Sequence, residues 1–198
     1  MKIYVAAVSG NSYKVKILVS LLKIPCELVT LDISRNKLEH KEPPFLAINP
    51  RGEVPALEDD DVVLWDSSAC LVYLARRYGG ERWLPTEPGA LARVTQWLAL
   101  AASEIQFGLQ YGRRGVSQGR WTAGDLETCQ RIAAIALTTM ETRLKSHDWL
   151  AASHPTIADV ACFPYTETAP EGKVALDPYP GVRAWLERCK GLPGWPAR

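Results

Sequence analysis

Two short segments of the chain combine residue types that could bind a small anionic ligand. Residues 49–57 read Asn-Pro-Arg-Gly-Glu-Val-Pro-Ala-Leu. The Val-Pro step between a glycine turn and a short apolar run suggests that backbone groups there are left available for a ligand. In residues 65–68 an acid and two hydroxyls follow a strand-like run and precede a helical pattern. Unpaired amides and small polar side chains converge at such a helix start, which suits a carboxylate.

A third polar cluster, Ser9-Gly10-Asn11-Ser12, follows a short apolar run and precedes another helical pattern. Turn chemistry alone predicts a turn and a helix cap at this place. The acid and hydroxyl of residues 66–67 could likewise form no more than a helix cap. Capping and anion binding use the same backbone amides, however, so the two interpretations apply together.

The elements that would position these clusters begin with a β-α-β unit. The apolar run of residues 2–5 predicts a first strand. A helix follows it, marked by the apolar residues Val15, Leu18, Val19 and Leu22. Pro25 ends this helix, and the apolar positions of residues 28–31 predict a second strand. Strands joined in this way are expected to pair in parallel.

A hairpin and a further helix complete the first predicted domain. Two strand-like segments, 55–58 and 62–65, lie on either side of an acidic turn, and the helix after them is closed by two glycines. A Pro/Gly-rich connector follows, where the composition changes. We therefore expect an α+β domain over residues 1–79 and a linker over residues 80–89.

The remaining residues, 90–198, show helical patterns and predict an all-α domain. One apolar stripe consists of Val94, Trp97, Leu98, Ala101 and Ile105, and another of Ile132, Ile135, Ala136 and Met140. A third helix is expected to begin at Thr156, which with Asp159 forms a variant of the capping box. The fourth stripe consists of Val182, Trp185, Leu186 and Cys189.

Composition argues against several classes of function. Lys and Arg number 23 against 22 Asp and Glu, giving a net charge of +1. The overall electrostatic field of the protein therefore does not favour binding to nucleic acid or to an anionic membrane. The 5 cysteines lie far apart, without a Cys-x-x-Cys pair or metal-ligand spacing, and are interpreted as buried free thiols rather than a metal site. No apolar run approaches membrane-spanning length and the start lacks a signal-type apolar segment, so we expect a cytoplasmic protein.

In order and spacing, the Gly-x-Val-Pro segment, the acid-Ser step at residues 66–67 and the Thr156 cap closely resemble those of cytosolic glutathione transferases. The resemblance covers essentially the whole chain. It implies an α/β thioredoxin-like N-terminal domain, an all-helical C-terminal domain that binds an electrophile, and a homodimer. It also implies glutathione as the co-substrate, no metal, and a role in detoxification.

The resemblance places Ser9 where Ser-type members of the family keep the hydroxyl that faces the glutathione sulfur. Asn11 falls at a position used by a bacterial subgroup with a Thr/Ser-x-Asn pattern, so it is a second candidate for the thiolate donor. No cysteine occupies the position that thiol-transferring members use. The tyrosine of mammalian-type members would have to be Tyr4, which lies inside the first predicted strand. A Ser/Asn-type site is therefore expected.

Further family contacts concern the cysteinyl and γ-glutamyl parts of glutathione. Val54 stands where backbone groups pair with the cysteinyl unit, and we expect the bond to Pro55 to be cis, since a cis X-Pro bond costs little. Asp66 and Ser67 stand where Glu-Ser usually holds the γ-glutamyl end. Asp in place of Glu shortens the arm but keeps the negative charge.

The glycyl end of glutathione would meet His40 and Lys41, which match a His-Lys pair of plant-like members. Without the resemblance, these residues in a charged stretch would be interpreted as a solvated face. Glu53 falls where a Gln is usual in the family. Its negative charge near a ligand carboxylate should weaken binding unless Arg51 or Lys41 compensates.

Three functions are compatible with these residues. The first is conjugation of glutathione to a small hydrophobic electrophile; the second is a glutathione-binding module with little transferase activity, for which Glu53 is the support. The third is a glutathione-dependent peroxidase or disulfide reductase. Candidate electrophile contacts in the helical domain are Ile105, Phe107, Leu109 and Tyr111, with Arg113 or Arg114 as polar contacts. The sequence does not identify the electrophile.

Overall fold

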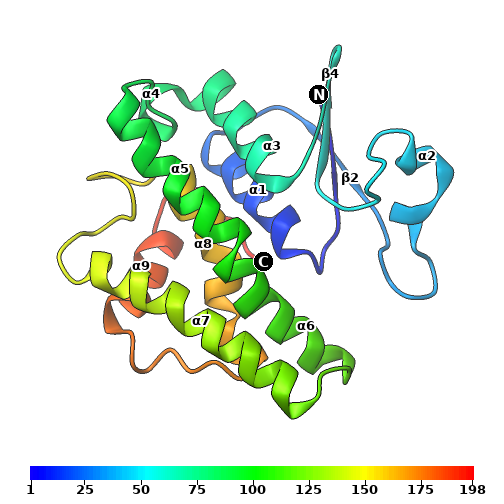
Figure 1. The fold of residues 1–198 in the computed structure, drawn as a ribbon. Coiled ribbons are helices and arrows are strands. Elements are labelled where there is room, and N and C mark those ends of the chain that lie inside the picture. Colours follow the sequence, from blue (N-terminus) through cyan, green and yellow to red (C-terminus); the bar gives the residue numbers. More distant parts are fainter. The chain divides into compact units, whose positions relative to one another are not determined.

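The computed structural model describes residues Met1–Arg198 and divides into two compact units (Figure 1). Unit 1 comprises Met1–Gly80 together with Gly194–Arg198, and unit 2 comprises Glu81–Pro193. The final five residues, which the sequence assigns to the helical domain, thus group with unit 1. Hydrogen bonds attach them there: the Tyr13 hydroxyl donates to the carbonyl of Pro196 at 2.9 Å.

Unit 1 contains a four-stranded mixed sheet with the order β2-β1-β3-β4. The predicted parallel β-α-β unit is confirmed, with Ile3 opposite Leu28 in the register of β1 and β2. The predicted hairpin is confirmed as well, because β3 and β4 pair in antiparallel fashion and β3 also pairs with β1. The strands are β1 (Lys2–Val5), β2 (Glu27–Thr30), β3 (Ala56–Asp59) and β4 (Val62–Trp65).

Two helices, α1 (Gly10–Leu21) and α3 (Ser67–Leu74), lie side by side on one face of this sheet (Figure 1). Their inner faces and the sheet form a core that contains the fully buried residues Ile3, Leu18, Leu57, Leu71 and Leu74. After α3 the chain continues as a π-helical turn, η2 (Ala75–Gly79), and a single turn, α4 (Gly80–Trp83). Helical structure therefore extends into the residues predicted to form a linker.

Two short helices, η1 (Glu39–Lys41) and α2 (Pro43–Leu46), lie in the charged stretch for which the sequence predicted no element. They are too short to show a helical period. Pro43 begins α2 with a fixed φ, and the buried Phe45 side chain attaches the turn to the unit. The ring of Phe45 lies 5.6 Å from that of Tyr4 in β1.

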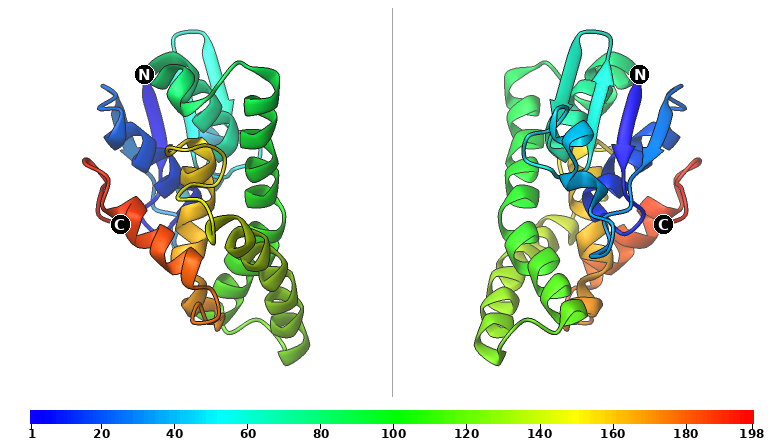
Figure 2. Two further views of the ribbon diagram at one scale, coloured as in Figure 1. Left: turned by 90° about the vertical axis from the view of Figure 1, so that its left-hand side faces the viewer. Right: turned by 90° about the vertical axis from the view of Figure 1, so that its right-hand side faces the viewer.

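Unit 2 is entirely helical, as predicted. Its central helix is α8 (Ile157–Glu167), whose residues 157–166 are nearly all buried, and Figure 2 shows it with α5 on one side and α9 on the other. The other helices are α5 (Pro88–Ala102), η3 (Ile105–Gln110), α6 (Tyr111–Gln118), α7 (Ala123–Leu144), η4 (Ala169–Gly172) and α9 (Pro180–Lys190).

The cap predicted at Thr156 is confirmed. Its hydroxyl accepts a hydrogen bond from the Ala158 amide at 3.2 Å, and the Asp159 carboxylate accepts one from the Thr156 amide at 3.0 Å. The same carboxylate, fully inside the unit, also accepts from the indole of Trp185 at 2.9 Å. This cap therefore links the start of α8 to α9.

Two predictions about the helical stripes are wrong. Ile105 does not continue the stripe of α5, because the helix ends at Ala102 and Ser103 has ψ −94°, outside the helical region. Ile105 instead lies in the π-helical η3. Ile135, predicted as core, is 50% exposed on the outer face of α7.

All five cysteines are free, and four of them are buried, as predicted, whereas Cys26 is partly exposed. Burial raises the pKa of the Cys70 thiol to about 12, so this group stays protonated at neutral pH. Across the chain, no helix combines the length and apolar character needed to span a bilayer.

Candidate functional site

The loop between β1 and α1 is held by two serine hydroxyls. Ser9 is the N-cap of α1, and its Oγ accepts a hydrogen bond from the amide of Ser12 at 3.1 Å. The Ser12 Oγ in turn accepts from the amide of Ala6 at 3.1 Å. The helix begins at Gly10, so Ser9, rather than Ser12, is the cap. A hydroxyl that accepts in this way keeps its own proton for donation to a ligand.

Asn11 and Ser67 come from different helices and meet at the end of the sheet. The Ser67 hydroxyl donates to Oδ1 of Asn11 at 3.4 Å, joining the first turn of α3 to the first turn of α1. Because the amide oxygen is used in this bond, the amide nitrogen of Asn11 has its two N–H groups for another acceptor. Two residues singled out by sequence are thus in direct contact.

Asp66 is the N-cap of α3. Its Oδ1 accepts hydrogen bonds from the amides of Ser68 at 2.8 Å and Ala69 at 3.4 Å. The backbone of Asp66 has φ 76°, a left-handed conformation that is uncommon for a residue with a side chain. The carboxylate is exposed, so its second oxygen faces solvent at a helix start that favours anions nearby.

The Val54–Pro55 peptide bond is cis, which confirms the prediction. The side chain of Val54 is held in a small apolar cluster with Ala6, Phe45 and Ala56. Among the loop and turn hydrogen bonds between backbone groups, none uses the N–H or the C=O of Val54. The apolar cluster therefore fixes this residue by its side chain and leaves its backbone groups for a further partner.

Asn49 organises the loop that precedes Val54. This residue is 1% exposed, its Oδ1 accepts from the Arg51 amide at 3.0 Å, and its Nδ2 donates to the Glu53 carbonyl at 2.6 Å. The turn is closed by the amide of Gly52, which donates to the Asn49 carbonyl at 2.8 Å. Asn49 was not predicted to have such a role, although an Asn before Pro is a recognisable signal for a side-chain turn.

The charge of Glu53 is paired within the protein. Its carboxylate lies 3.1 Å from Nη2 of Arg51, and the two side chains are 63% and 52% exposed. The Arg51 guanidinium also lies 5.4 Å from the centre of the Trp65 ring. Arg51 therefore supplies the positive charge that was expected to compensate for Glu53 near a ligand carboxylate.

His40 and Lys41 lie next to this loop. Lys41 Nζ donates to the carbonyl of Arg51 at 3.1 Å. Gly52 packs so closely against this pair that a Cβ at its position would lie 2.8 Å from the His40 carbonyl oxygen and 2.9 Å from Cδ of Lys41. The backbone of Gly52 has φ +57°, which also favours glycine.

A small surface hollow joins these segments in unit 1. Its lining includes five of the residues predicted from sequence, namely Asn11, Glu53, Val54, Asp66 and Ser67. It also includes four residues that were not predicted to contact a ligand, namely Asn49, Arg51, Pro55 and Trp65. The other three predicted residues, Ser9, His40 and Lys41, are not part of this lining. The hollow brings together donors, two acids and one guanidinium from three separate segments.

The hydroxyl of Tyr4 already has a hydrogen-bond partner within the sheet of unit 1. This hydroxyl donates to the Glu58 carboxylate at 2.6 Å. This hydrogen bond, with burial as a further cause, raises the pKa of Tyr4 to about 12. A hydroxyl used in this way is a poor donor for a thiolate, in agreement with the Ser/Asn arrangement.

In unit 2, the predicted electrophile contacts separate into buried and exposed residues. Ile105 and Leu109 are 0% and 1% exposed, so they belong to the core and their assignment as ligand contacts is wrong. Phe107 is 46% exposed and meets the ring of Tyr111 edge to face, with 5.1 Å between the ring centres. Of the two candidate arginines, Arg113 forms an ion pair with Glu171.

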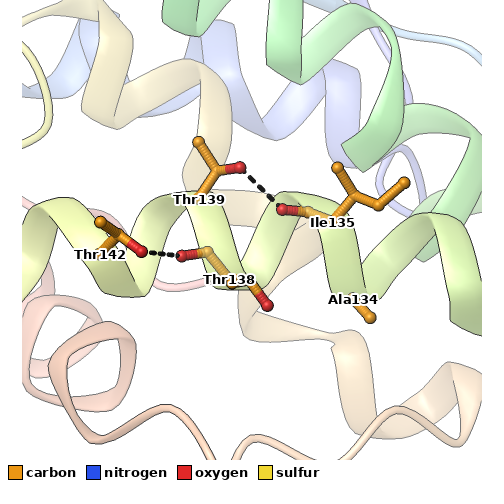
Figure 3. Close-up of a pocket in the computed structure, with 5 residues that line it drawn as sticks. All are labelled: Ala134, Ile135, Thr138, Thr139 and Thr142. Carbon is orange, nitrogen blue, oxygen red and sulfur yellow. Dashed lines mark hydrogen bonds between the residues drawn. The ribbon is translucent and has the colours of Figure 1, made fainter.

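A second hollow lies on the outer face of α7 and is shown in Figure 3. The hydroxyls of Thr139 and Thr142 donate to carbonyls of their own helix, at Ile135 and Thr138, both at 2.8 Å. The lining residues are Ala134, Ile135, Thr138, Thr139 and Thr142. None of these residues supplies an acid, a base or a strong nucleophile, so the hollow of unit 1 is the better candidate for chemistry.

Comparisons with known proteins assign both units to one family. The family model of the glutathione S-transferase N-terminal domain matches residues 3–82, and that of the C-terminal domain matches residues 122–193. Glutathione S-transferase D7 of Anopheles gambiae is 33% identical over 178 residues, which cover 89% of this chain and 79% of that protein.

Solved structures show the same likeness. A crystal structure of a glutathione S-transferase from Pseudomonas fluorescens Pf-5 superposes with a TM-score of 0.90 at 32% identity, covering 99% of this chain and 97% of that one. A glutathione S-transferase from Xanthobacter autotrophicus Py2 gives a TM-score of 0.87 at 34% identity, covering 98% and 94% of the two chains.

Proposed function

The chain belongs to the glutathione S-transferase family, and from this premise we propose that it activates the thiol of glutathione and conjugates it to a small hydrophobic electrophile. The observation that carries the proposal is the hollow of unit 1, where Asn11, Val54, Asp66 and Ser67 lie together. These side chains and backbone groups offer neutral donors, an exposed carboxylate and a helix start, which complement a peptide with one thiol, one ammonium and two carboxylates.

Activation requires the thiolate to be favoured over the thiol. A free thiol has a pKa near 8.5, so only a few per cent is ionised at neutral pH. Lowering that pKa by about two units requires about 2.7 kcal/mol of preferential interaction with the anion. A hydrogen bond from the Ser9 hydroxyl, a second from the Asn11 amide and the first amides of α1 together supply an interaction of this size.

The remaining groups hold the two ends of glutathione. The exposed carboxylate of Asp66 pairs with the γ-glutamyl ammonium, while Ser67 and the start of α3 bind the adjacent carboxylate. The backbone of Val54 pairs with the cysteinyl unit in the manner of a short β-ladder. His40 and Lys41, beside Gly52, contact the glycyl end of glutathione.

In the reaction, the thiol proton passes to water and the thiolate attacks the electrophilic carbon. The sulfur lone pair forms the new carbon–sulfur bond, and on an aryl halide the halide leaves with the electron pair of its former bond to carbon. The exposed Phe107, edge to face with the half-buried Tyr111, offers an apolar surface for an aromatic electrophile. No protein group forms a covalent bond in this scheme.

The test is a titration of the bound glutathione thiol by its ultraviolet absorbance in the wild type, Ser9→Ala and Asn11→Ala. We expect a lowered thiol pKa in the wild type, and a rise in each variant. Ser9→Thr keeps both the cap and the hydroxyl, so it should retain most of the shift, and Ser117→Ala in unit 2 is the matched control. A wild-type thiol pKa near 8.5 would refute the proposed activation.

We also infer that the protein works as a homodimer in the cytoplasm and takes part in detoxification, since these properties are typical of its family. Multi-angle light scattering measures the first: the mass should be twice 21.9 kDa. Turnover of an activated aryl halide, compared with reduction of a hydroperoxide, separates conjugation from a peroxidase function. Retention on immobilised glutathione without turnover would favour a binding module.

A further inference from the structure

Arg51 and Glu53 form an ion pair at the edge of the glutathione hollow. Nη2 of Arg51 lies 3.1 Å from Oε2 of Glu53, and both residues line the hollow beside Val54. More than half of each side chain is exposed. Exposed ion pairs contribute little to stability, because water screens the attraction. Glu53 can therefore give way to another carboxylate without a large loss to the fold.

The backbone on both sides of this pair is fixed. The buried side chain of Asn49 accepts a hydrogen bond from the Arg51 amide and donates one to the Glu53 carbonyl. These two bonds hold the backbone of both residues in place. Lys41 holds the Arg51 carbonyl from the other side. The Arg51 guanidinium, 5.4 Å from the ring centre of Trp65, thus stays at the hollow while its partner is exchanged.

We propose that Arg51 is the residue that binds the glycyl carboxylate of glutathione, and that Glu53 is an internal competitor for it; this inference rests on the proposed function. The α-carboxylate of the γ-glutamyl end is placed at Ser67 and the start of α3, and at the glycyl end Lys41 already donates to the Arg51 carbonyl. A guanidinium binds carboxylates through two parallel hydrogen bonds, which a lysine ammonium cannot reproduce. In the free protein Glu53 occupies that position, so ligand binding has to displace it.

Two substitutions should then act in opposite directions on the dissociation constant of reduced glutathione, measured by calorimetry. Glu53→Gln removes the competitor and should lower the constant about fivefold, or ~1 kcal/mol. Arg51→Met should raise it about tenfold, or ~1.4 kcal/mol. Arg51→Lys keeps the charge without the planar fork and should lie between Arg51→Met and the wild type. In the Arg51→Met background, Glu53→Gln should change the constant less than about twofold.

Glutathione esterified at the glycyl carboxylate identifies which end of the ligand is involved. The ester lacks the charge that Arg51 binds, so its dissociation constant should be the same in the wild type and Arg51→Met. If Arg51→Met weakens the ester and glutathione equally, Arg51 does not bind the glycyl carboxylate. If Glu53→Gln strengthens binding equally with and without Arg51, Glu53 acts directly on the ligand. Either result overturns the inference.

The control is Asp177→Asn, which breaks a remote exposed ion pair with Arg183 and should leave both constants unchanged. All variants change exposed side chains, and their thermal midpoints should stay within a few degrees of the wild type. Should the wild type bind neither glutathione nor its ester, the proposed function itself fails. Should it bind both while the Arg51 and Glu53 variants remain equal to the wild type, only the inference about this pair fails.

Discussion

The hydroxyl of Ser67 donates to Oδ1 of Asn11 across 3.4 Å. This bond joins residues that are 56 positions apart in the chain and lie at the starts of two neighbouring helices. It fixes which end of the Asn11 amide carries the donors, since the oxygen faces Ser67 and the nitrogen faces the other way. The proposed thiolate donor Asn11 and Ser67, which we propose binds the γ-glutamyl end, are therefore joined by a hydrogen bond.

Ser67→Ala should therefore affect the sulfur as well as the carboxylate of bound glutathione. Loss of one neutral hydrogen bond is worth about 0.5–1.5 kcal/mol, so the pKa of the bound thiol should rise by about 0.4–1 unit. The ultraviolet titration measures this rise separately from any loss of affinity. In an Asn11→Ala background the same substitution should leave the thiol pKa unchanged; a further rise there would show that Ser67 acts on the sulfur without Asn11.

Asn49 should be among the most sensitive residues of unit 1. Asn49→Ala leaves the Arg51 amide and the Glu53 carbonyl without their partner in a buried place, which should lower the free energy of unfolding by about 1–3 kcal/mol. Asn49→Asp keeps the acceptor for the Arg51 amide and loses the donor to the Glu53 carbonyl. Its free energy of unfolding should therefore fall less than that of Asn49→Ala, and the loss should come from the bond at residue 53. Urea unfolding measures both variants, and equal stability of Asn49→Ala and the wild type would contradict the assigned role.

Gly52 is required for two reasons that can be separated. Gly52→Ala has the cost of a left-handed backbone, about 1–2 kcal/mol, and also a Cβ overlap with the His40 carbonyl oxygen, which adds about 1–3 kcal/mol. Gly119 is the matched control, because it has φ +60° and nothing within 4 Å of an added Cβ. Gly119→Ala should thus lose only the first amount on urea unfolding. Equal losses at the two positions would mean that the packing of Gly52 against His40 is unimportant.

Much of unit 1 could be predicted because its signals are local. Strand periodicity, the acidic hairpin turn and the capping residues act within a few positions, so the β-α-β unit, the hairpin and the start of α3 after Asp66 follow from neighbouring residues. The pairing of β3 with β1, which sets the sheet order, joins distant segments and was not predicted. The one-turn helices η1 and α2 have too few residues to show a period. Their position depends on Phe45 packing against Tyr4, which is a long-range contact.

The errors at Ile105 and Leu109 have a common physical cause. An apolar period of 3.6 residues continues from α5 through residues 103–105, but the chain leaves the helical conformation at Ser103 and resumes as a π-helix. That change places the side chains of Ile105 and Leu109 in the core and the side chain of Phe107 at the surface. The close approach of Gly108 to Ala133 in α7 accompanies this change, and no local pattern signals it.

The candidate site shows the same division between local and long-range signals. Asn11, Val54, Asp66 and Ser67 were indicated by turn and cap patterns and do line one hollow. The Asn-Pro step signals a side-chain turn at Asn49, but no local pattern signals the ion pair of Arg51 with Glu53 that the two bonds of Asn49 support.

Tyr4 gives the fold an alkaline pH dependence that one substitution should remove. The hydrogen bond to Glu58 raises the pKa of Tyr4 to about 12 in the folded protein, against about 10 in an unfolded chain. Between these values the folded state binds more protons than the unfolded state, so the free energy of unfolding must fall as the pH rises from about 10 to about 12. The contribution is fully present below pH 10. Tyr4→Phe lacks this proton, so its urea midpoint should decline less steeply between pH 10 and pH 12 than that of the wild type. Parallel declines would show that the bond between Tyr4 and Glu58 does not hold the phenol proton in solution.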